Sequence, residues 1–259
     1  VKGTSLHVGY ARYFTPPPVE YVSTADLAKF DNTTNAAATP ISSQVRAERA
    51  HYFDAGITQS LTPSWSFGVD AYYKKAKNQI DEGQFGQAVV FSTFNYDTGK
   101  VLGIEFTTNY SHKGLSAYAN LAIGRATGKK FTSGEFFFSQ DRVDYVSAYN
   151  VHLDHEQLYT ASSGVSYKIA HSLIYADALF GTGLRRGFAN TDHLPSYTTV
   201  NLGFQQDFPL QEHQMISLRL DVVNVFDKIY ELRDGSGIGV GAPQFGSRRG
   251  IYGGVTLSF

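Results

Sequence analysis

The final nine residues, IYGGVTLSF at positions 251–259, constrain the fold more than any other part of the chain. Ile251, Val255, Leu257 and Phe259 fall on one face of an extended segment, and Tyr252 falls on the other with small or polar residues. That two-residue period predicts a β-strand whose two faces meet different surroundings. Because a strand edge exposes unpaired backbone groups, we expect this segment to pair with a neighbouring strand.

The same alternation recurs along the whole chain, and no helical period of comparable length competes with it. Short connections at 61–64, 112–114, 170–172 and 209–214 alternate with long ones at 15–49, 78–99, 126–157 and 227–247 and an intermediate one at 185–196, and we expect the long ones to be irregular. Short turns on one side and long loops on the other are typical of outer-membrane barrels. The sequence therefore predicts an all-β fold, a transmembrane antiparallel up-and-down β-barrel of about ten strands. The predicted strands are 4–14, 50–60, 64–75, 100–111, 115–125, 158–169, 173–184, 197–207, 215–226 and 251–259.

Composition narrows the classes of function. The chain has 259 residues, a formal net charge of −1 and no cysteine, which argues against nucleic-acid binding, disulfides and thiol chemistry. No apolar run is long enough for a membrane-spanning helix, and a barrel with a polar lumen also has low mean hydropathy. Since the chain begins without a signal peptide, we expect it to be a mature form or a fragment.

The distribution of charge predicts which face meets lipid. An Arg or Lys on the lipid face near the bilayer midplane costs about 2–4 kcal/mol. Arg219 and Asp221 lie two residues apart on one face of their strand, so that face is expected to line the lumen. A soluble sandwich would instead bury the apolar face. The same rule predicts lumen-facing positions for Asp70, Glu105 and Asp177.

The long connections hold the candidates for chemistry. His152, Asp154, His155 and Glu156 cluster where a loop meets a strand, but they lack the helical His-Glu-x-x-His spacing, so a solvated rim is favoured over a metal or acid–base site. We expect no catalytic residue, no metal and no cofactor. Aromatic residues of the 126–157 connection either contact a ligand or pack the loop, and rim arginines suit an anionic ligand or lipopolysaccharide phosphates. The candidate ligand-binding residues are Phe137, Tyr145, Arg185, Arg186, Arg233 and Arg248, with Arg249 beside them.

Two segments near the end of the chain resemble the corresponding part of TonB-dependent outer-membrane receptors: DVVNVFDKIY at 221–230 and GSRRGIYGGVTLSF at 246–259. In that family an Asn-(Val/Leu)-Phe-Asp-Lys-x-Tyr motif closes the penultimate strand, and the last strand ends on Phe. The triplet Gly103-Ile-Glu105 also fits the family. The resemblance covers residues 1–259 as one partial barrel domain. Because family barrels have about 22 strands around a plug, it implies the C-terminal portion of such a barrel without its plug domain.

The resemblance also implies a place and a role. The place is the outer membrane of a Gram-negative bacterium, and the role is uptake of a scarce nutrient such as a ferric siderophore. Implied partners are outer-membrane lipid and lipopolysaccharide, the barrel-assembly machinery, and the TonB system if a plug domain lies upstream. The terminal strand would then be the assembly signal, read through Tyr252, Val255, Leu257 and Phe259.

Two alternatives stay open at this point. One is a self-contained small outer-membrane channel or adhesin, in which segment 4–14 would pair with segment 251–259 to close the barrel. The other is an outer-membrane hydrolase active at the rim through the His152–Glu156 cluster.

Overall fold

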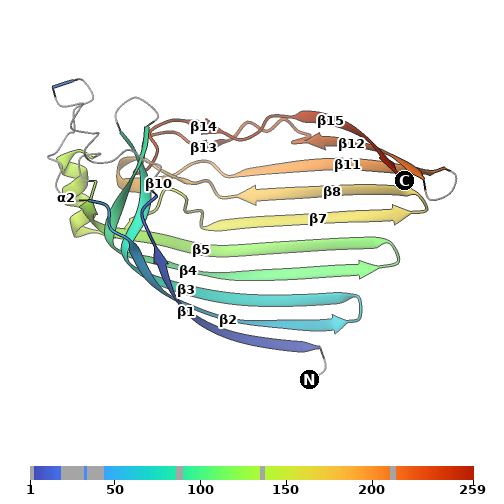
Figure 1. Ribbon diagram of the computed structural model, residues 1–259, viewed down its shortest axis with the longest axis horizontal. Helices are drawn as coiled ribbons and strands as arrows, with labels where there is room; N and C mark the ends of the chain where they lie inside the picture. Colours follow the sequence, from blue (N-terminus) through green and yellow to red (C-terminus); the bar gives the residue numbers. More distant parts are fainter. Residues whose placement is uncertain (1–2, 19–31, 34–43, 86–89, 135–137, 211–213) are drawn as a thin grey trace.

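Ten long strands form one curved antiparallel sheet in the computed structural model, which describes residues 3–18, 32–33, 44–85, 90–134, 138–210 and 214–259 (Figure 1). Each strand pairs with the next long strand along the chain, so the order in the sheet follows the sequence. The predicted all-β, up-and-down arrangement is confirmed. The strands are β1 (Thr4–Thr15), β2 (Glu48–Thr62), β3 (Trp65–Phe85), β4 (Val90–His112), β5 (Leu115–Ser133), β7 (Tyr159–Ile169), β8 (Ser172–Gly181), β11 (Tyr197–Pro209), β12 (Met215–Val223) and β15 (Gly250–Ser258).

One face of the sheet, the apolar face, carries aliphatic and aromatic side chains. Leu6, Ile57, Val69, Phe106 and Leu121 are direct cross-strand partners in one line across β1 to β5. Leu6 is 73% exposed, although a soluble fold would bury a leucine at such a position. Exposed apolar side chains along every strand suit a surface that meets hydrocarbon rather than water.

The opposite face, the polar face, carries the charged residues of the strands. Asp70 is the cross-strand partner of Gly56 and of Glu105, and Asp177 is the partner of Asn201. Arg219 and Asp221 lie on the same face of β12, where Arg219 Nε is 2.7 Å from Asp221 Oδ2. The residues predicted to line the lumen therefore share this face: Asp70, Glu105, Asp177, Arg219 and Asp221. Their role in the lumen stays a prediction.

Glycines on the polar face make room for tyrosine rings. A Cβ atom at Gly164 would lie 2.5 Å from the Tyr118 ring, and one at Gly203 would lie 2.1 Å from the Tyr175 ring. Each tyrosine therefore lies flat over the backbone of the adjacent strand. This packing explains why glycine stands at these interior strand positions, because any larger residue would displace the tyrosine ring.

The expectation of irregular long connections is wrong for the segment 78–99. β3 and β4 continue through it as a hairpin, with 21 and 23 residues respectively. A barrel strand needs only about 9–11 residues to cross the membrane, so both strands project well beyond it. The physical reason is that paired strands satisfy their backbone hydrogen bonds outside the membrane as well as inside it.

The 126–157 connection is also more regular than expected. β5 extends to Ser133, the helix α2 spans Gln140–Ala148, and β6 (Val151–His152) pairs with β5. The helix was not expected because it has only 9 residues and a single buried side chain, Val146, so its period is weak in the sequence. Two further connections hold a 3₁₀ turn, η3 (Phe188–Asn190), and two small ladders, β9 (Arg185–Arg186) with β10 (Asp192–His193) and β13 (Glu231–Arg233) with β14 (Gln244–Phe245). Among the described residues, no helix is both long and apolar enough to cross a membrane.

The two ends of the sheet differ, as Figure 1 shows. One end, the turn end, carries the short connections, including those at 63–64, 113–114 and 170–171. The other end, the loop end, carries α2 and the small ladders. Within the described residues β1 pairs with β2 and β15 pairs with β12, so these two strands are the edges of an open sheet and do not pair with each other.

Candidate functional site

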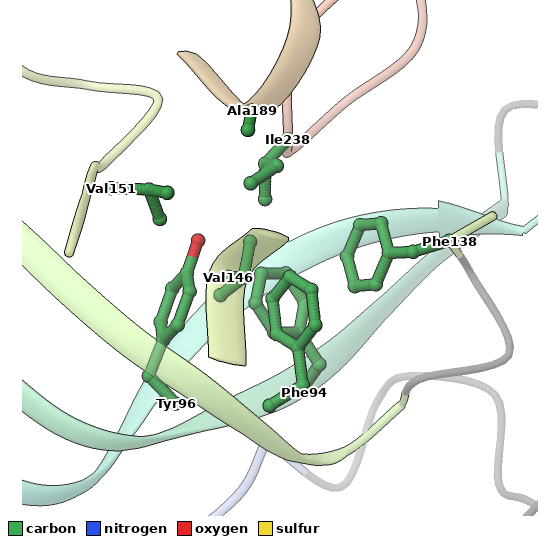
Figure 2. Packing of buried hydrophobic residues seen from close by; sticks show 8 residues of the cluster. Phe94, Tyr96, Phe138, Val146, Val151, Ala189 and Ile238 are labelled. Atoms are coloured by element: carbon green, nitrogen blue, oxygen red, sulfur yellow. The ribbon is translucent and has the colours of Figure 1, made fainter. Parts of the chain in front are cut away.

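The connections at the loop end share one buried core, which we call the loop core. Its aromatic centre is built by β4 and β5: the Phe94 ring lies 5.2 Å from Tyr96 and 5.4 Å from Phe131, both in edge-to-face geometry. Phe138 stacks on Phe131 at 4.3 Å. Figure 2 shows Val146 of α2, Ala189 of η3 and Ile238 pointing toward these rings. The members are Phe94, Tyr96, Phe131, Phe138, Val146, Val151, Ala189 and Ile238.

Glu156 ties the loops to the sheet through three partners. Arg185 Nη2 lies 2.6 Å from Glu156 Oε1, and His152 Nδ1 lies 2.8 Å from Glu156 Oε2. The backbone N–H of Ala126 also donates to Oε2, at 2.8 Å. The carboxylate is almost fully buried, at 4% exposure. A buried carboxylate with a cation and two further donors is a structural anchor, because removing any partner would leave charge unsatisfied.

A second group joins the buried Asp154 and Arg233 with the exposed His155. Arg233 Nε lies 2.8 Å from Asp154 Oδ2, although the N–H is poorly aligned with that oxygen, and Arg233 Nη2 lies 2.9 Å from His155 Nε2. Burial raises the pKa of the Asp154 carboxyl, and Arg233 opposes that rise. Nearby, burial raises the pKa of Asp81 to about 7, while the Glu82 backbone N–H lowers it.

These contacts account for the rim cluster that the sequence singled out. His152, Asp154, His155 and Glu156 each bond to an arginine or to a group that an arginine already neutralises. In the described part of the chain, no group of three or more His, Asp or Glu side chains is arranged to hold a metal ion. The expectation of a solvated rim is wrong for Asp154 and Glu156, which are buried, because arginines from other connections cover and neutralise their carboxylates.

The four arginines predicted to bind ligand all have carboxylate partners. Arg185 pairs with Glu156 and Arg233 with Asp154, and both arginines are largely buried. On the more exposed rim, Arg186 pairs with Asp192 at 3.0 Å and Arg248 with Asp227 at 2.5 Å. Arg248, followed by the N–H of Arg249, holds the pKa of Asp227 well below its usual value. A ligand role for these arginines stays a prediction, and an anion would have to compete with these carboxylates.

An exposed aromatic group beside α2 is the strongest candidate for ligand contact. The rings of Tyr145 and Tyr149 lie 4.8 Å apart, and Phe188 meets Tyr145 edge to face at 5.4 Å. The guanidinium of Arg142 lies over Phe188, 5.8 Å from the ring centre. Tyr149 and Phe188 are 59% and 42% exposed. We call Arg142, Tyr145, Tyr149 and Phe188 the aromatic surface.

Arg142 differs from the rim arginines because no carboxylate pairs with it in the described residues. Its Nη atoms reach only the carbonyls of Ser236 and Gly237, both at 3.5 Å, and its buried Nε has no hydrogen-bond partner. Burial lowers the pKa of the guanidinium, which nevertheless remains charged at neutral pH. Such a partly desolvated cation beside aromatic rings can bind an anion.

Sequence reasoning found Tyr145 but missed Arg142 and Phe188. Arg142 and Tyr145 are three residues apart, which places them on one side of a helix, but that signal requires the helix to be recognised first. Phe188 reaches Tyr145 from a different connection, so only the tertiary structure reveals the pair. Phe137, the other aromatic candidate, lies outside the described residues.

A curved antiparallel sheet with one exposed apolar face, one polar face and loops at one end defines the wall of a membrane β-barrel. A model of the TonB-dependent receptor-like β-barrel family matches residues 1–225, so the chain belongs to the TonB-dependent receptor family. Proteins of this family reside in the outer membrane of Gram-negative bacteria, and so does this one. The family consists of transport receptors rather than enzymes.

Solved receptors share the fold at low sequence identity. The ferric citrate transporter FecA in its unliganded form is 18% identical with a TM-score of 0.67, and the match covers 100% of this chain and 36% of FecA. The FrpB iron transporter from Neisseria meningitidis is 14% identical (TM-score 0.63; 98% and 37% covered). The siderophore receptor PiuA from Acinetobacter baumannii is 15% identical (TM-score 0.64; 100% and 34% covered). This chain thus spans about a third of the length of these receptors. No curated protein sequence matches it.

Proposed function

We propose that this chain is the C-terminal part of the barrel of a receptor that imports a ferric siderophore or a similar anionic iron chelate. The observation that carries the proposal is the aromatic surface at the loop end, where Arg142 has no carboxylate partner among the described residues and lies over Phe188. An anionic chelate would meet Arg142 through charge and the exposed rings through stacking. Family membership and the iron or siderophore transporters among the structural neighbours support this class of ligand.

The loop core supports the proposal in a second way. α2 and η3 bear the aromatic surface, and Val146 and Ala189 anchor these two elements in the buried cluster with Phe94. The ligand-contacting side chains therefore sit on an ordered platform. Such preorganisation improves affinity because less conformational entropy is lost on binding.

The expected partners follow from the same proposal. The polar face would surround a plug domain supplied by the rest of the receptor, and that plug would engage the TonB system. The strand β15, with Tyr252, Val255, Leu257 and Phe259, would be recognised by the barrel-assembly machinery. Lipid and lipopolysaccharide would surround the apolar face.

The test measures binding of ferric citrate and ferric pyoverdine to the full-length receptor in detergent, by quenching of intrinsic fluorescence. Arg142→Gln removes the unpaired charge, while Lys113→Gln removes a charge from the turn end as the matched control. A charge-assisted hydrogen bond contributes about 1.5–3 kcal/mol, so R142Q should weaken binding of the recognised chelate by about 10- to 150-fold. Equal affinity of R142Q and K113Q, or no binding of any ferric chelate by the wild type, would overturn the proposal.

A further inference from the structure

We propose that a proton on Asp81 latches residues 233–241 onto the loop core and thereby controls whether the aromatic surface is assembled. We call residues 233–241 the latch segment. The inference rests on the proposed function for its effect on ligand binding, because it names the regulator of that same site. Docking of the latch segment can be measured without any ligand, so the latch and the proposed function can fail separately.

Asp81 lies where an ionised carboxylate has little support. It is 8% exposed and is the cross-strand partner of Phe94, which belongs to the loop core. Its Oδ1 accepts the Glu82 backbone N–H at 2.9 Å, whereas its buried Oδ2 has no hydrogen-bond partner among the described residues. Ionising a buried carboxyl group whose second oxygen lacks a donor is unfavourable, so the geometry favours the protonated form.

One guanidinium serves two buried carboxyl groups. Arg233 Nε lies 2.8 Å from Asp154 Oδ2, and Asp154 is only 5% exposed. Burial raises the pKa of Asp81, and the charge of Asp154 raises it further. The Glu82 N–H lowers this pKa, and Arg233 lowers it less. The other charged or titratable groups that act on these carboxyl groups are Glu82 of β3, Tyr96 of β4 with Arg142 of α2 beyond it, His155, and Asp234 beside β13. Since Arg233 is engaged by Asp154, charge balance requires a proton on Asp81.

Two contacts of the latch segment end on this pair of carboxyl groups. Arg233 begins the segment and pairs with Asp154. Gly239 packs so closely that a Cβ atom there would lie 2.8 Å from Asp154 Cγ, and its φ of +133° favours glycine. An ionised Asp81 would compete for Arg233 and repel Asp154, so it would loosen both contacts. Because a solvated carboxylate avoids this repulsion, ionisation favours release of the latch segment.

The latch segment supports the aromatic surface from two sides. On the side of α2, the carbonyls of Ser236 and Gly237 accept from the Arg142 guanidinium, both at 3.5 Å. On the side of η3, the Asn190 side chain accepts the Ile238 N–H at 2.8 Å and donates to the Ile238 carbonyl at 3.2 Å. The segment thus bridges the two elements that bear the aromatic surface. Its release removes these bonds, and with them the preorganisation that favours ligand binding.

The direction of the pH effect follows from these contacts. Burial raises the pKa of Asp81 to about 7 while the latch segment is docked, against 3.8 when the carboxyl group meets water. Docking is therefore most favourable below pH 4, and it weakens as the pH rises to 7. Over that interval each pH unit lowers the docking equilibrium constant by about tenfold. At higher pH the carboxyl group is ionised in both arrangements, so the effect levels off.

The first test measures opening of the latch segment in the ligand-free, full-length receptor in detergent. Val240 is buried in the segment, and this chain has no cysteine, so Val240→Cys reports opening through its rate of thiol labelling once any cysteine elsewhere in the receptor is replaced by serine. Asp81→Asn keeps the shape of the side chain without its charge, and Asp144→Asn removes an exposed carboxylate from α2 as the matched control. Dividing each labelling rate by that of the Asp81→Asn background at the same pH cancels the reactivity of the thiol. Between pH 5 and pH 7 the ratio should rise about 100-fold in the wild-type and Asp144→Asn backgrounds.

The second test measures affinity for ferric citrate and ferric pyoverdine over the same pH range. The wild type should lose affinity relative to Asp81→Asn as the pH rises, because a change in the chelate itself affects both proteins alike. If Asp81→Asn does not fold, Asp154→Asn decides, since it frees Arg233 for Asp81 and should move the pH dependence of labelling to lower pH. A carboxylate with a merely structural role would not cause that displacement.

The outcomes separate the latch from the proposed function. A labelling ratio that stays constant with pH, or an unchanged pH dependence in Asp154→Asn, would overturn the latch whatever ligand binds. A pH-dependent labelling ratio together with a constant relative affinity would refute control of the aromatic surface. A pH-dependent labelling ratio with no chelate bound by any variant would support the latch and reject the proposed function.

Discussion

Truncation of Phe94 to alanine should release α2 from the barrel while leaving the membrane-spanning strands intact. Phe94 is fully buried, and its ring meets Tyr96, Phe131 and Phe138 edge to face at 5.1–5.4 Å. Removing a buried phenylalanine side chain costs about 3–5 kcal/mol, since the cavity adds to the lost transfer free energy. The upper half of that range applies here, because three aromatic contacts disappear together.

The loss of packing energy in F94A predicts faster hydrogen exchange of the α2 amides. The loop core lies at the loop end of the sheet, so α2 can open locally without unfolding the strands. The packing energy lost in F94A therefore lowers the free energy of this local opening directly. Amides of Gln140–Ala148 should therefore exchange about 900- to 4,500-fold faster in F94A than in the wild type. The measurement is hydrogen exchange of the full-length receptor in detergent, followed by mass spectrometry of peptides.

Phe226→Ala is the matched control, because Phe226 is 76% exposed and contributes little packing. Its α2 amides should exchange at the wild-type rate. The reasoning fails if F94A leaves α2 exchange unchanged, which would mean that the loop core does not hold the helix. It also fails if β12 exchange rises as much as α2 exchange, since the effect would then be global.

Two other predictions concern the sheet and the loop carboxylates. Leu218 lies on the apolar face, so Leu218→Arg should destabilise the receptor in lipid vesicles by about 2–4 kcal/mol, whereas Ser217→Arg on the polar face should cost far less; equal urea midpoints would contradict the face assignment. Burial raises the pKa of Asp81 to about 7 in the folded state, against 3.8 when unfolded. Its contribution to loop stability should therefore be complete below pH 4 and fall as the pH rises to 7. Hydrogen exchange of the loop core should show this fall in the wild type but not in Asp81→Asn.

The strand pattern could be predicted from the sequence because its cause is local. Alternation of residues such as Leu218 and Arg219 records directly which side chain meets lipid and which does not. Ten predicted segments correspond to the ten long strands of the sheet, and the family resemblance of the last two segments agrees with the family match over residues 1–225. The extension of β3 and β4 beyond the membrane was not predictable in this way, because outside the membrane the two faces no longer differ so sharply.

The candidate site, unlike the strand pattern, could not be predicted from the sequence. Arg185, Arg186, Arg233 and Arg248 look like free cations in the sequence, yet each pairs with a carboxylate that lies elsewhere in the chain or on a neighbouring turn. Arg142 looks unremarkable in the sequence, yet it is the cation without a carboxylate partner among the described loop-end residues near the aromatic surface. Pairing between distant loops has no sequence period, so no local rule reveals it.

The sequence alone determined the class of fold, the assignment of each strand face and the membrane setting, because hydrocarbon and water impose a two-residue period on every spanning strand. It also determined, through the motif at 221–230 and the terminal strand, which family to expect. Only the tertiary structure decided which charges are neutralised and which aromatic residues share the loop core. The physical reason is that register and loop packing join residues far apart in the chain, and their contact energies depend on distances that no single segment encodes.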